Sequence, residues 1–171
     1  MVIIIVILLV LILSGCQSHK QESPENILNQ PGLKEAIYDY LQSNILSPNF
    51  GGKVFCDYEL FGTEIKNDRV YIYLWTLCME YYLEDDGLKE GSGISLPIVL
   101  TVLSLGEGYK IIEHKQPADG EGTYPDYKEI FPKKYHKKIF PVAEEYNRRA
   151  DCLSKATEEQ ARIYYDLEQD V

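Results

Sequence analysis

Hydrophobic residues recur along this 171-residue chain at two spacings, one helical and one typical of strands. Between positions 33 and 46 they recur every three or four residues. This spacing predicts an amphipathic helix that buries Leu33, Ile37, Tyr40, Leu41 and Ile45. Ser23-Pro24 predicts an earlier helix start, because serine caps a helix and proline suits its first turn. Pro31-Gly32 then interrupts or restarts that helix.

The middle of the chain is rich in β-branched and aromatic residues, which predicts strands. Residues 54–65 and 69–83 form a first predicted hairpin, joined by a three-residue turn at 66–68. Residues 94–105 and 109–116 form a second predicted hairpin. The sequence therefore predicts four antiparallel strands in two hairpins.

Polar and turn-forming residues separate these elements. Residues 83–93 and 116–127 carry clustered Gly, Asp, Glu and Pro, which predicts two solvated loops. Pro97 cannot donate a backbone hydrogen bond, so its strand is predicted to be an edge or to carry a bulge there.

The C-terminal part returns to helical spacing. A short helix is predicted over 129–139, and a longer one from Val142, with a kink where Thr157 begins a capping box. The order of elements predicts an α+β fold with helices on one face of a small antiparallel sheet, as a single domain over 24–171. The layout resembles those of cystatin-like and NTF2-like proteins, and such layouts host many functions.

The amino terminus carries an unbroken apolar run over residues 2–13. A membrane-spanning helix needs about 20 apolar residues, whereas signal-peptide cores have about 7 to 15. The run ends in Leu13-Ser14-Gly15-Cys16, which resembles the lipobox of bacterial lipoprotein precursors. The resemblance implies removal of residues 1–15, lipidation of Cys16 and a tether over 16–23, with the domain on the extracytoplasmic side of the cell membrane. The alternative is a short membrane anchor or a buried strand.

The net charge of the chain limits the kinds of molecule that it is expected to bind. The chain has 17 Lys and Arg against 27 Asp and Glu, a formal net charge of −10. Such a surface repels nucleic acid at long range, which disfavours nucleic-acid binding. The membrane is the expected partner through the lipid anchor, together with a protein, peptide or cell-envelope ligand.

Three cysteines follow the lipobox. If Ile65 pairs with Arg69 across the predicted turn, Cys56 lies directly opposite Cys78. The face that carries both is the more continuously apolar one, and the helix with Leu33, Ile37 and Leu41 is predicted to pack over it. The pattern is consistent with a disulfide between the two cysteines and equally with two buried free thiols. Cys152 is predicted to be a small core residue. The chain has no CxxC or HxxxH spacing, so no metal site is expected. It has no phosphate loop and no dinucleotide fingerprint, so no cofactor is expected.

Catalytic motifs are sparse. Clustered carboxylates at Glu84, Asp85 and Asp86, or His114, would suit a small hydrolase, and this is the alternative function. The Asp and Gly residues of 119–126 do not follow a calcium-loop pattern and are expected to form a solvated loop. No catalytic residue is assigned from the sequence.

Two groups of residues are candidates for a binding surface. Four lysines around two rings oppose the net charge and would suit anionic lipid or an acidic cell-wall polymer, unless they are simply a solvated helix face: Lys133, Lys134, Tyr135, His136, Lys137 and Lys138. Tyr71, Tyr73 and Trp75 share one strand face, which either binds a ligand or is covered by the C-terminal helix. The exposure of the Trp75 side chain distinguishes an open binding face from one covered by the C-terminal helix. The leading hypothesis is a lipid-anchored binding or accessory module.

Overall fold

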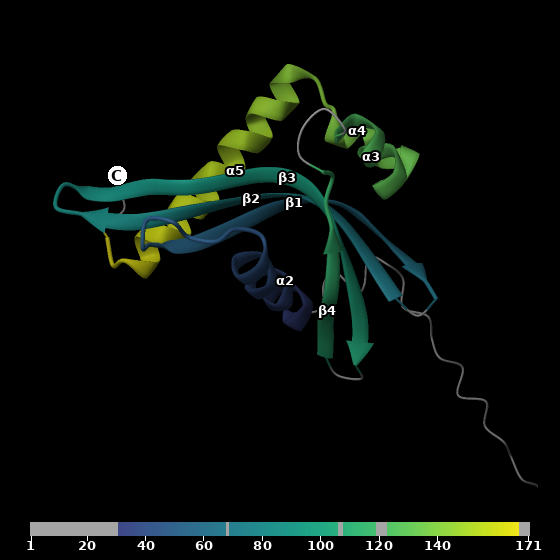
Figure 1. The fold of residues 1–171 in the computed structure, drawn as a ribbon, viewed down its shortest axis with the longest axis horizontal. Coiled ribbons are helices and arrows are strands. Elements are labelled where there is room, and N and C mark those ends of the chain that lie inside the picture. Colours follow the sequence, from purple (N-terminus) through teal and green to yellow (C-terminus); the bar gives the residue numbers. More distant parts are fainter. Residues whose placement is uncertain (1–30, 68, 106–107, 119–122, 168–171) are drawn as a thin grey trace, which may run out of the picture.

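The structure is a computed structural model, and it describes residues 31–67, 69–105, 108–118 and 123–167. The lipobox, the tether and the helix start at Ser23 therefore lie outside the described residues. The elements follow in the order α2 (Pro31–Asn44), β1 (Lys53–Lys66), β2 (Arg69–Glu84), β3 (Gly87–Leu105), β4 (Gly108–Lys115), α3 (Thr123–Ile130), the 3-10 helix η1 (Lys133–Tyr135), α4 (His136–Ile139) and α5 (Ala143–Tyr164). The four strands form one antiparallel sheet in the order β1-β2-β3-β4 (Figure 1), and the predicted α+β class is confirmed.

Helices cover both faces of the sheet rather than one, which corrects the predicted layering (Figure 1). Helix α2 packs over the face that carries Cys56 and Cys78, as the apolar pattern predicted. Helix α5, η1 and α4 cover the opposite face. Both faces need a cover because strand β2 is buried on both sides along most of its length.

A buried arginine holds helix α5 to the face of the sheet opposite α2. Arg149 is 2% exposed, and its Nε donates to Glu59 Oε2 at 2.8 Å. Its Nη2 donates to the backbone carbonyl of Lys138 at 2.6 Å. Its guanidinium lies 4.8 Å from the Trp75 ring centre and 5.2 Å from that of Phe61. One side chain thus joins α5, α4 and two strands by charge and ring contacts.

Three predictions for the C-terminal part need correction. Helix α5 runs unbroken past Thr157, whose hydroxyl donates to the Ser154 carbonyl within the helix instead of starting a new one. The predicted loop over 116–127 already becomes helical at α3, and its residues 119–122 lie outside the described residues. Cys152 is exposed on α5 and is not a core residue.

The first hairpin has the predicted cysteine pair but a different turn. Cys56 lies opposite Cys78, and the two form a disulfide with Cα atoms 4.1 Å apart. At the turn, however, Arg69 pairs with Lys66 and not with Ile65. A bulge between Leu60 and Gly62 adds one residue to β1 and restores the cysteine register. Gly62 has φ 152°, and a side chain there would meet the Tyr135 ring.

The predicted polar loop over 83–93 is instead the end of the long β2–β3 hairpin, which we call the arm, and β1 runs beside β2 as far as Tyr81. Strands β2 and β3 stay paired up to Glu84 and Gly87. Gly87 has φ 124°, a conformation that favours glycine at the tight turn. Strand β4 pairs with β3 only from Val99 onward, so residues 87–98 form an open edge that includes Pro97, as predicted for that proline.

A buried carboxylate fixes the loop between α2 and β1. Glu80 is fully buried and accepts backbone N–H bonds from Asn49 at 2.8 Å, Phe50 at 2.8 Å, Gly52 at 2.9 Å and Ser92 at 3.3 Å. Burial alone would raise the pKa of Glu80, but these four donors outweigh it and lower the pKa to about 2. The carboxylate therefore stays ionised and binds a loop and a strand together.

Side chains from the C-terminal helices reach the edge strand β1. Gln160 Nε2 donates to the Cys56 carbonyl at 3.1 Å, and Lys138 Nζ donates to the Phe61 carbonyl at 2.9 Å. Two backbone acceptors of this edge strand thus have side-chain donors.

Candidate functional site

The aromatic face predicted as a binding surface belongs to the core. Trp75 is 9% exposed and Tyr73 is 4% exposed, and the Trp75 indole donates to Ser95 Oγ at 2.8 Å. Tyr71 is half-buried beside them. The C-terminal helices cover this face, which was the alternative to an open site. The binding-surface prediction for these three residues is corrected accordingly.

The residues of the alternative hydrolase do not come together. Glu84, Asp85 and Asp86 lie exposed at the tip of the arm, where Asp86 pairs with Lys89 at 2.6 Å. His114 pairs with Leu100 on the sheet, about 40 Å of strand away from the tip. Its Nδ1 lies 2.9 Å from the Tyr40 hydroxyl, and burial lowers its pKa. Among the described residues, no group of three His, Cys, Asp or Glu side chains could hold a metal ion.

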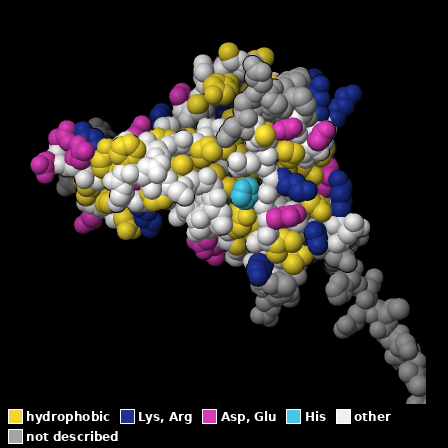
Figure 2. Space-filling view, viewed as in Figure 1, with side chains coloured by type: hydrophobic (Ala, Val, Ile, Leu, Met, Phe, Trp, Pro, Cys, Tyr) yellow, Lys and Arg dark blue, Asp and Glu magenta, His cyan; other side chains and the backbone are white. Residues whose placement is uncertain are grey.

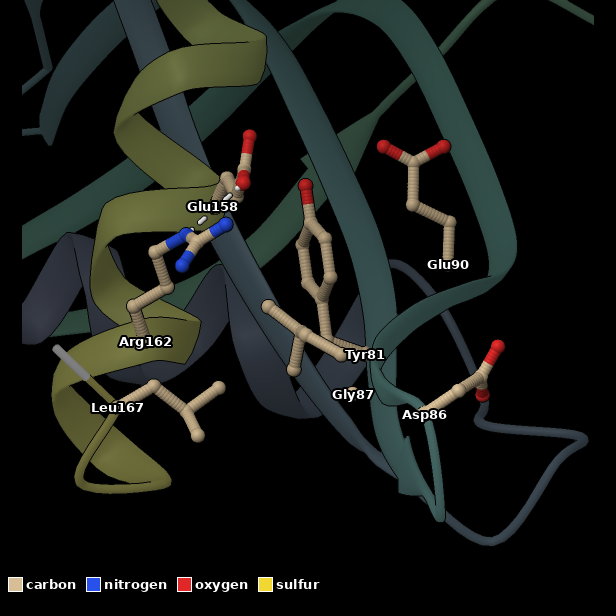
Figure 3. Close-up of a pocket in the computed structure, with 8 residues that line it drawn as sticks. Tyr81, Asp86, Gly87, Glu90, Glu158, Arg162 and Leu167 are labelled. Atoms are coloured by element: carbon tan, nitrogen blue, oxygen red, sulfur yellow. Dashed lines mark hydrogen bonds and ion pairs between the residues drawn. The ribbon is translucent and has the colours of Figure 1, made fainter. Parts of the chain in front are cut away.

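A cleft of about 450 Å³ lies between the arm and the end of α5 (Figure 3). The Tyr81 ring stands between the two elements, and its hydroxyl lies 3.3 Å from Thr157 Oγ1. Glu158 pairs with Arg162 at 3.0 Å across one turn of α5. The rim is acidic, with Asp86, Glu90 and Glu158. Tyr81 is only 1% exposed, so the cleft presents carboxylates without an accessible aromatic wall.

The lysines of the predicted cluster lie at the surface, whereas the Tyr135 ring is buried. Lys133, Lys134, Lys137 and Lys138 are exposed on η1 and α4, whereas Tyr135 is 7% exposed and packs on Tyr73. Lys134 pairs with Glu64 on β1, and Lys138 donates to the β1 backbone as described above. Lys134 and Lys138 therefore attach this cluster to strand β1, whereas Lys133 and Lys137 lie on its exposed surface.

A groove of about 570 Å³ runs between this cluster, α3 and the end of the first hairpin. We call it the lysine groove and define it by its lining residues: Glu64, Lys66, Tyr73, Lys128, Glu129, Ile130, Phe131, Pro132, Lys133 and His136. Its apolar part is the loop between α3 and η1. The His136 ring nitrogen Nε2 lies 2.8 Å from the Phe131 carbonyl and fixes that loop.

Two of the groove's lysines were not found from the sequence. Lys66 ends β1, and Lys128 lies on α3, far in sequence from each other and separate from the cluster at 133–138. No local motif links them, because tertiary packing alone brings these segments to one groove. The missing signal was long-range contact, which a single sequence does not contain.

Glu64 organises the lysine groove electrostatically. Its Oε2 accepts from Lys66 Nζ at 2.6 Å, and its Oε1 accepts from Lys134 Nζ at 2.8 Å. The Tyr73 hydroxyl also donates to Oε2, at 3.2 Å. Burial would raise the pKa of Glu64, but the two lysines and the hydroxyl lower it to about 2. The groove thus holds its lysines around an ionised carboxylate.

Charge is unevenly distributed over the molecule. Lys66, Lys128 and Lys133 line the groove together with Glu64 and Glu129, and Lys134 pairs with Glu64, which gives an excess of positive charge on a chain of net charge −10. Figure 2 shows Asp and Glu gathered at the tip of the arm, whereas many Lys and Arg side chains lie toward the opposite end of the molecule. The lysine groove is therefore better suited to an anion than the acidic cleft beside α5.

Comparisons with known proteins add no functional assignment to this geometry. Over residues 31–67, 69–105, 108–118 and 123–167, no helix combines the length and the apolar character of a membrane span. No protein family, curated protein or solved structure matches this chain.

Proposed function

We propose that the protein is a lipid-anchored, extracytoplasmic binding module that takes a phosphodiester-bearing component of the cell envelope into the lysine groove. The observation that carries the proposal is the convergence of lysines from β1, α3 and η1 on one hollow of an acidic molecule. The amino-terminal lipobox resemblance supplies the anchor, because lipidation of Cys16 would keep the domain beside the membrane.

The chemistry of the groove fits phosphodiesters. An ammonium is a compact point charge on a flexible stem, and it binds phosphate oxygens without demanding one fixed geometry. The lining adds apolar atoms from the half-buried Ile130 and Pro132, which suits the carbon backbone that links successive phosphates. The proposed activity is binding without turnover, since the lining shows no nucleophile placed beside a general base.

Removing two groove lysines tests the ligand. We expect Lys128→Gln with Lys133→Gln to bind soluble poly(glycerol phosphate) about ten- to thirtyfold more weakly, because each lysine near such an anion contributes about 1 kcal/mol. Isothermal titration of the full-length protein in a neutral detergent measures this at low salt. The matched control is Lys155→Gln with Lys110→Gln, which removes two exposed lysines outside the groove and should change affinity by less than about threefold.

The same variants distinguish the two sources of the phosphodiester. Vesicles of phosphatidylglycerol present glycerol phosphate as a lipid head group, whereas the soluble polymer presents it free of a bilayer. Binding of both probes that depends on Lys128 and Lys133 supports the proposal, and binding of only one identifies the source. Equal binding by the groove variant and the control variant would contradict it.

Replacement of the lipobox cysteine tests the anchor. We expect Cys16→Ala to leave the protein unprocessed or to release it from the membrane, because the thioether to the lipid forms only on that sulfur. Fractionation of cells, with mobility of the precursor and mature forms on a gel, measures this. A Cys152→Ser variant is the control, because it removes a thiol that is exposed on α5. A Cys16→Ala protein that is processed and retained like the wild type would overturn the anchor.

A further inference from the structure

The ion pairs within the lysine groove carry an inference that rests on the proposed function. Glu64 accepts from three donors on three elements: Lys66 of β1, Tyr73 of β2 and Lys134 of η1. A carboxylate and a phosphodiester are both oxyanions that take charge-assisted hydrogen bonds from ammonium groups. The Glu64 carboxylate therefore fills the position in the groove that an oxyanion of the ligand would occupy.

We propose that Glu64 is a built-in competitor for the ligand: its carboxylate binds Lys66 and Lys134 until a phosphodiester displaces it from them. Lys133 makes the first contact with the ligand, since it lines the groove outside the Glu64 pairs. Lys66 and Lys134 then turn toward the bound phosphate. A ligand with too little negative charge therefore does not displace Glu64, and the two lysines stay paired with it.

Exposure of the paired groups permits this exchange. The side chains of Lys66 and Lys134 are 60% and 56% exposed, whereas that of Glu64 is 18% exposed. The ammonium groups thus lie on flexible stems at the solvent side of a more enclosed carboxylate. Ion pairs between such exposed lysines and a carboxylate contribute little to stability, so a stronger anion can replace them.

The carboxylate keeps a partner after the exchange. The Tyr73 hydroxyl donates to Glu64 from the wall of the groove, and Tyr73 itself is fixed by packing against Tyr135 and Phe131. Loss of the two lysines therefore does not leave Glu64 without a donor. Because Tyr73 still holds the Glu64 carboxylate, the two lysines can pair with it again when the ligand leaves.

The decisive comparison is between the two carboxylates of the groove. We expect Glu64→Gln to bind poly(glycerol phosphate) about three- to tenfold more tightly than the wild type, because the amide cannot hold two ammonium groups but still accepts from Tyr73. Glu129→Gln removes the same charge from the exposed rim and should tighten binding by about twofold or less. Titrations of the full-length protein at several salt concentrations should also give a steeper salt dependence for Glu64→Gln, since more lysines then contact the polymer.

A second variant separates release of the lysines from removal of charge. Glu64→Asp keeps the charge but draws it back by one methylene, so it reaches the two lysines less well, and we expect binding about twofold tighter than that of the wild type. The inference is overturned if Glu64→Gln gains no more affinity than Glu129→Gln, or if Glu64→Asp binds like the wild type. Absence of any polymer binding by the wild type would instead overturn the proposed function, and this inference with it.

Discussion

Replacing Cys56 and Cys78 together by alanine lowers the free energy of unfolding by about 3 kcal/mol. The disulfide closes a loop between residues separated by 22 positions, and closing a loop of that length removes conformational freedom from the unfolded chain. Both cysteines are fully buried beneath α2, so the substitution also removes packed atoms from the core. Urea unfolding followed by far-ultraviolet circular dichroism measures the change.

Cys152→Ser is the matched control for this prediction. It removes the exposed thiol of α5 and should shift the free energy of unfolding by less than about 0.5 kcal/mol. Adding a reductant during unfolding should lower the stability of the wild type by the part that the bridge contributes and leave the double variant unchanged. A double variant as stable as the wild type would show that the bridge does not stabilise the sheet.

Glu80→Gln is expected to lower the melting temperature by roughly 5–10 °C. The fully buried carboxylate serves four backbone N–H donors, and an amide oxygen accepts fewer of them and carries no charge. The amide's own hydrogens would also point at donors. Differential scanning calorimetry at neutral pH measures the shift, with Glu159→Gln as the control because that carboxylate is exposed on α5. Equal melting temperatures for the two variants would contradict the role assigned to Glu80.

The same residue predicts a pH dependence with a definite sign. The pKa of Glu80 is lowered from 4.5 to about 2 by folding, so the native state holds the carboxylate ionised where the unfolded chain begins to protonate it. Its contribution is fully present above about pH 4.5 and is lost as the pH falls toward 2. Glu64 has its pKa lowered over the same range and adds to the effect. Acid titration should show a shallower loss of stability in Glu80→Gln than in the wild type.

Much of the fold followed from the period of apolar residues. The helical spacing of Leu33, Ile37 and Leu41 correctly placed α2 over the face of the sheet that carries Cys56 and Cys78. The apolar character of both faces of β2 was the signal for a second cover, although the order of elements alone had predicted helices on one face.

The cysteine register shows how a correct pairing can come from compensating errors. The predicted turn was one residue too long, and the bulge between Leu60 and Gly62 added one residue that the pattern did not reveal. The two shifts cancel at Cys56 and Cys78. The bulge depends on close contact between Gly62 and Tyr135, a residue more than 70 positions later, so the alternation of β1 alone did not contain it.

The arm and the groove show two further limits of a single sequence. Residues 87–93 are polar or glycine apart from Leu88, so no alternation distinguished them from a loop. Glu80 did carry a local signal, because it is a charged residue inside a run of apolar strand residues. For the lysine groove, the cluster at 133–138 was visible, but Lys66 and Lys128 join it only through tertiary packing.

The contacts along β1 have a consequence for self-association. An edge strand with unpaired backbone groups can template the addition of a strand from another molecule, the first step toward aggregates. Gln160 and Lys138 occupy two carbonyls of this edge, and the charge of Lys138 opposes the approach of an apolar strand. The open half of β3 carries its own protection in Pro97 and in the irregular pairing near Glu80. The β1 edge and the open part of β3 therefore resist growth into a continuous β-structure when many copies crowd together.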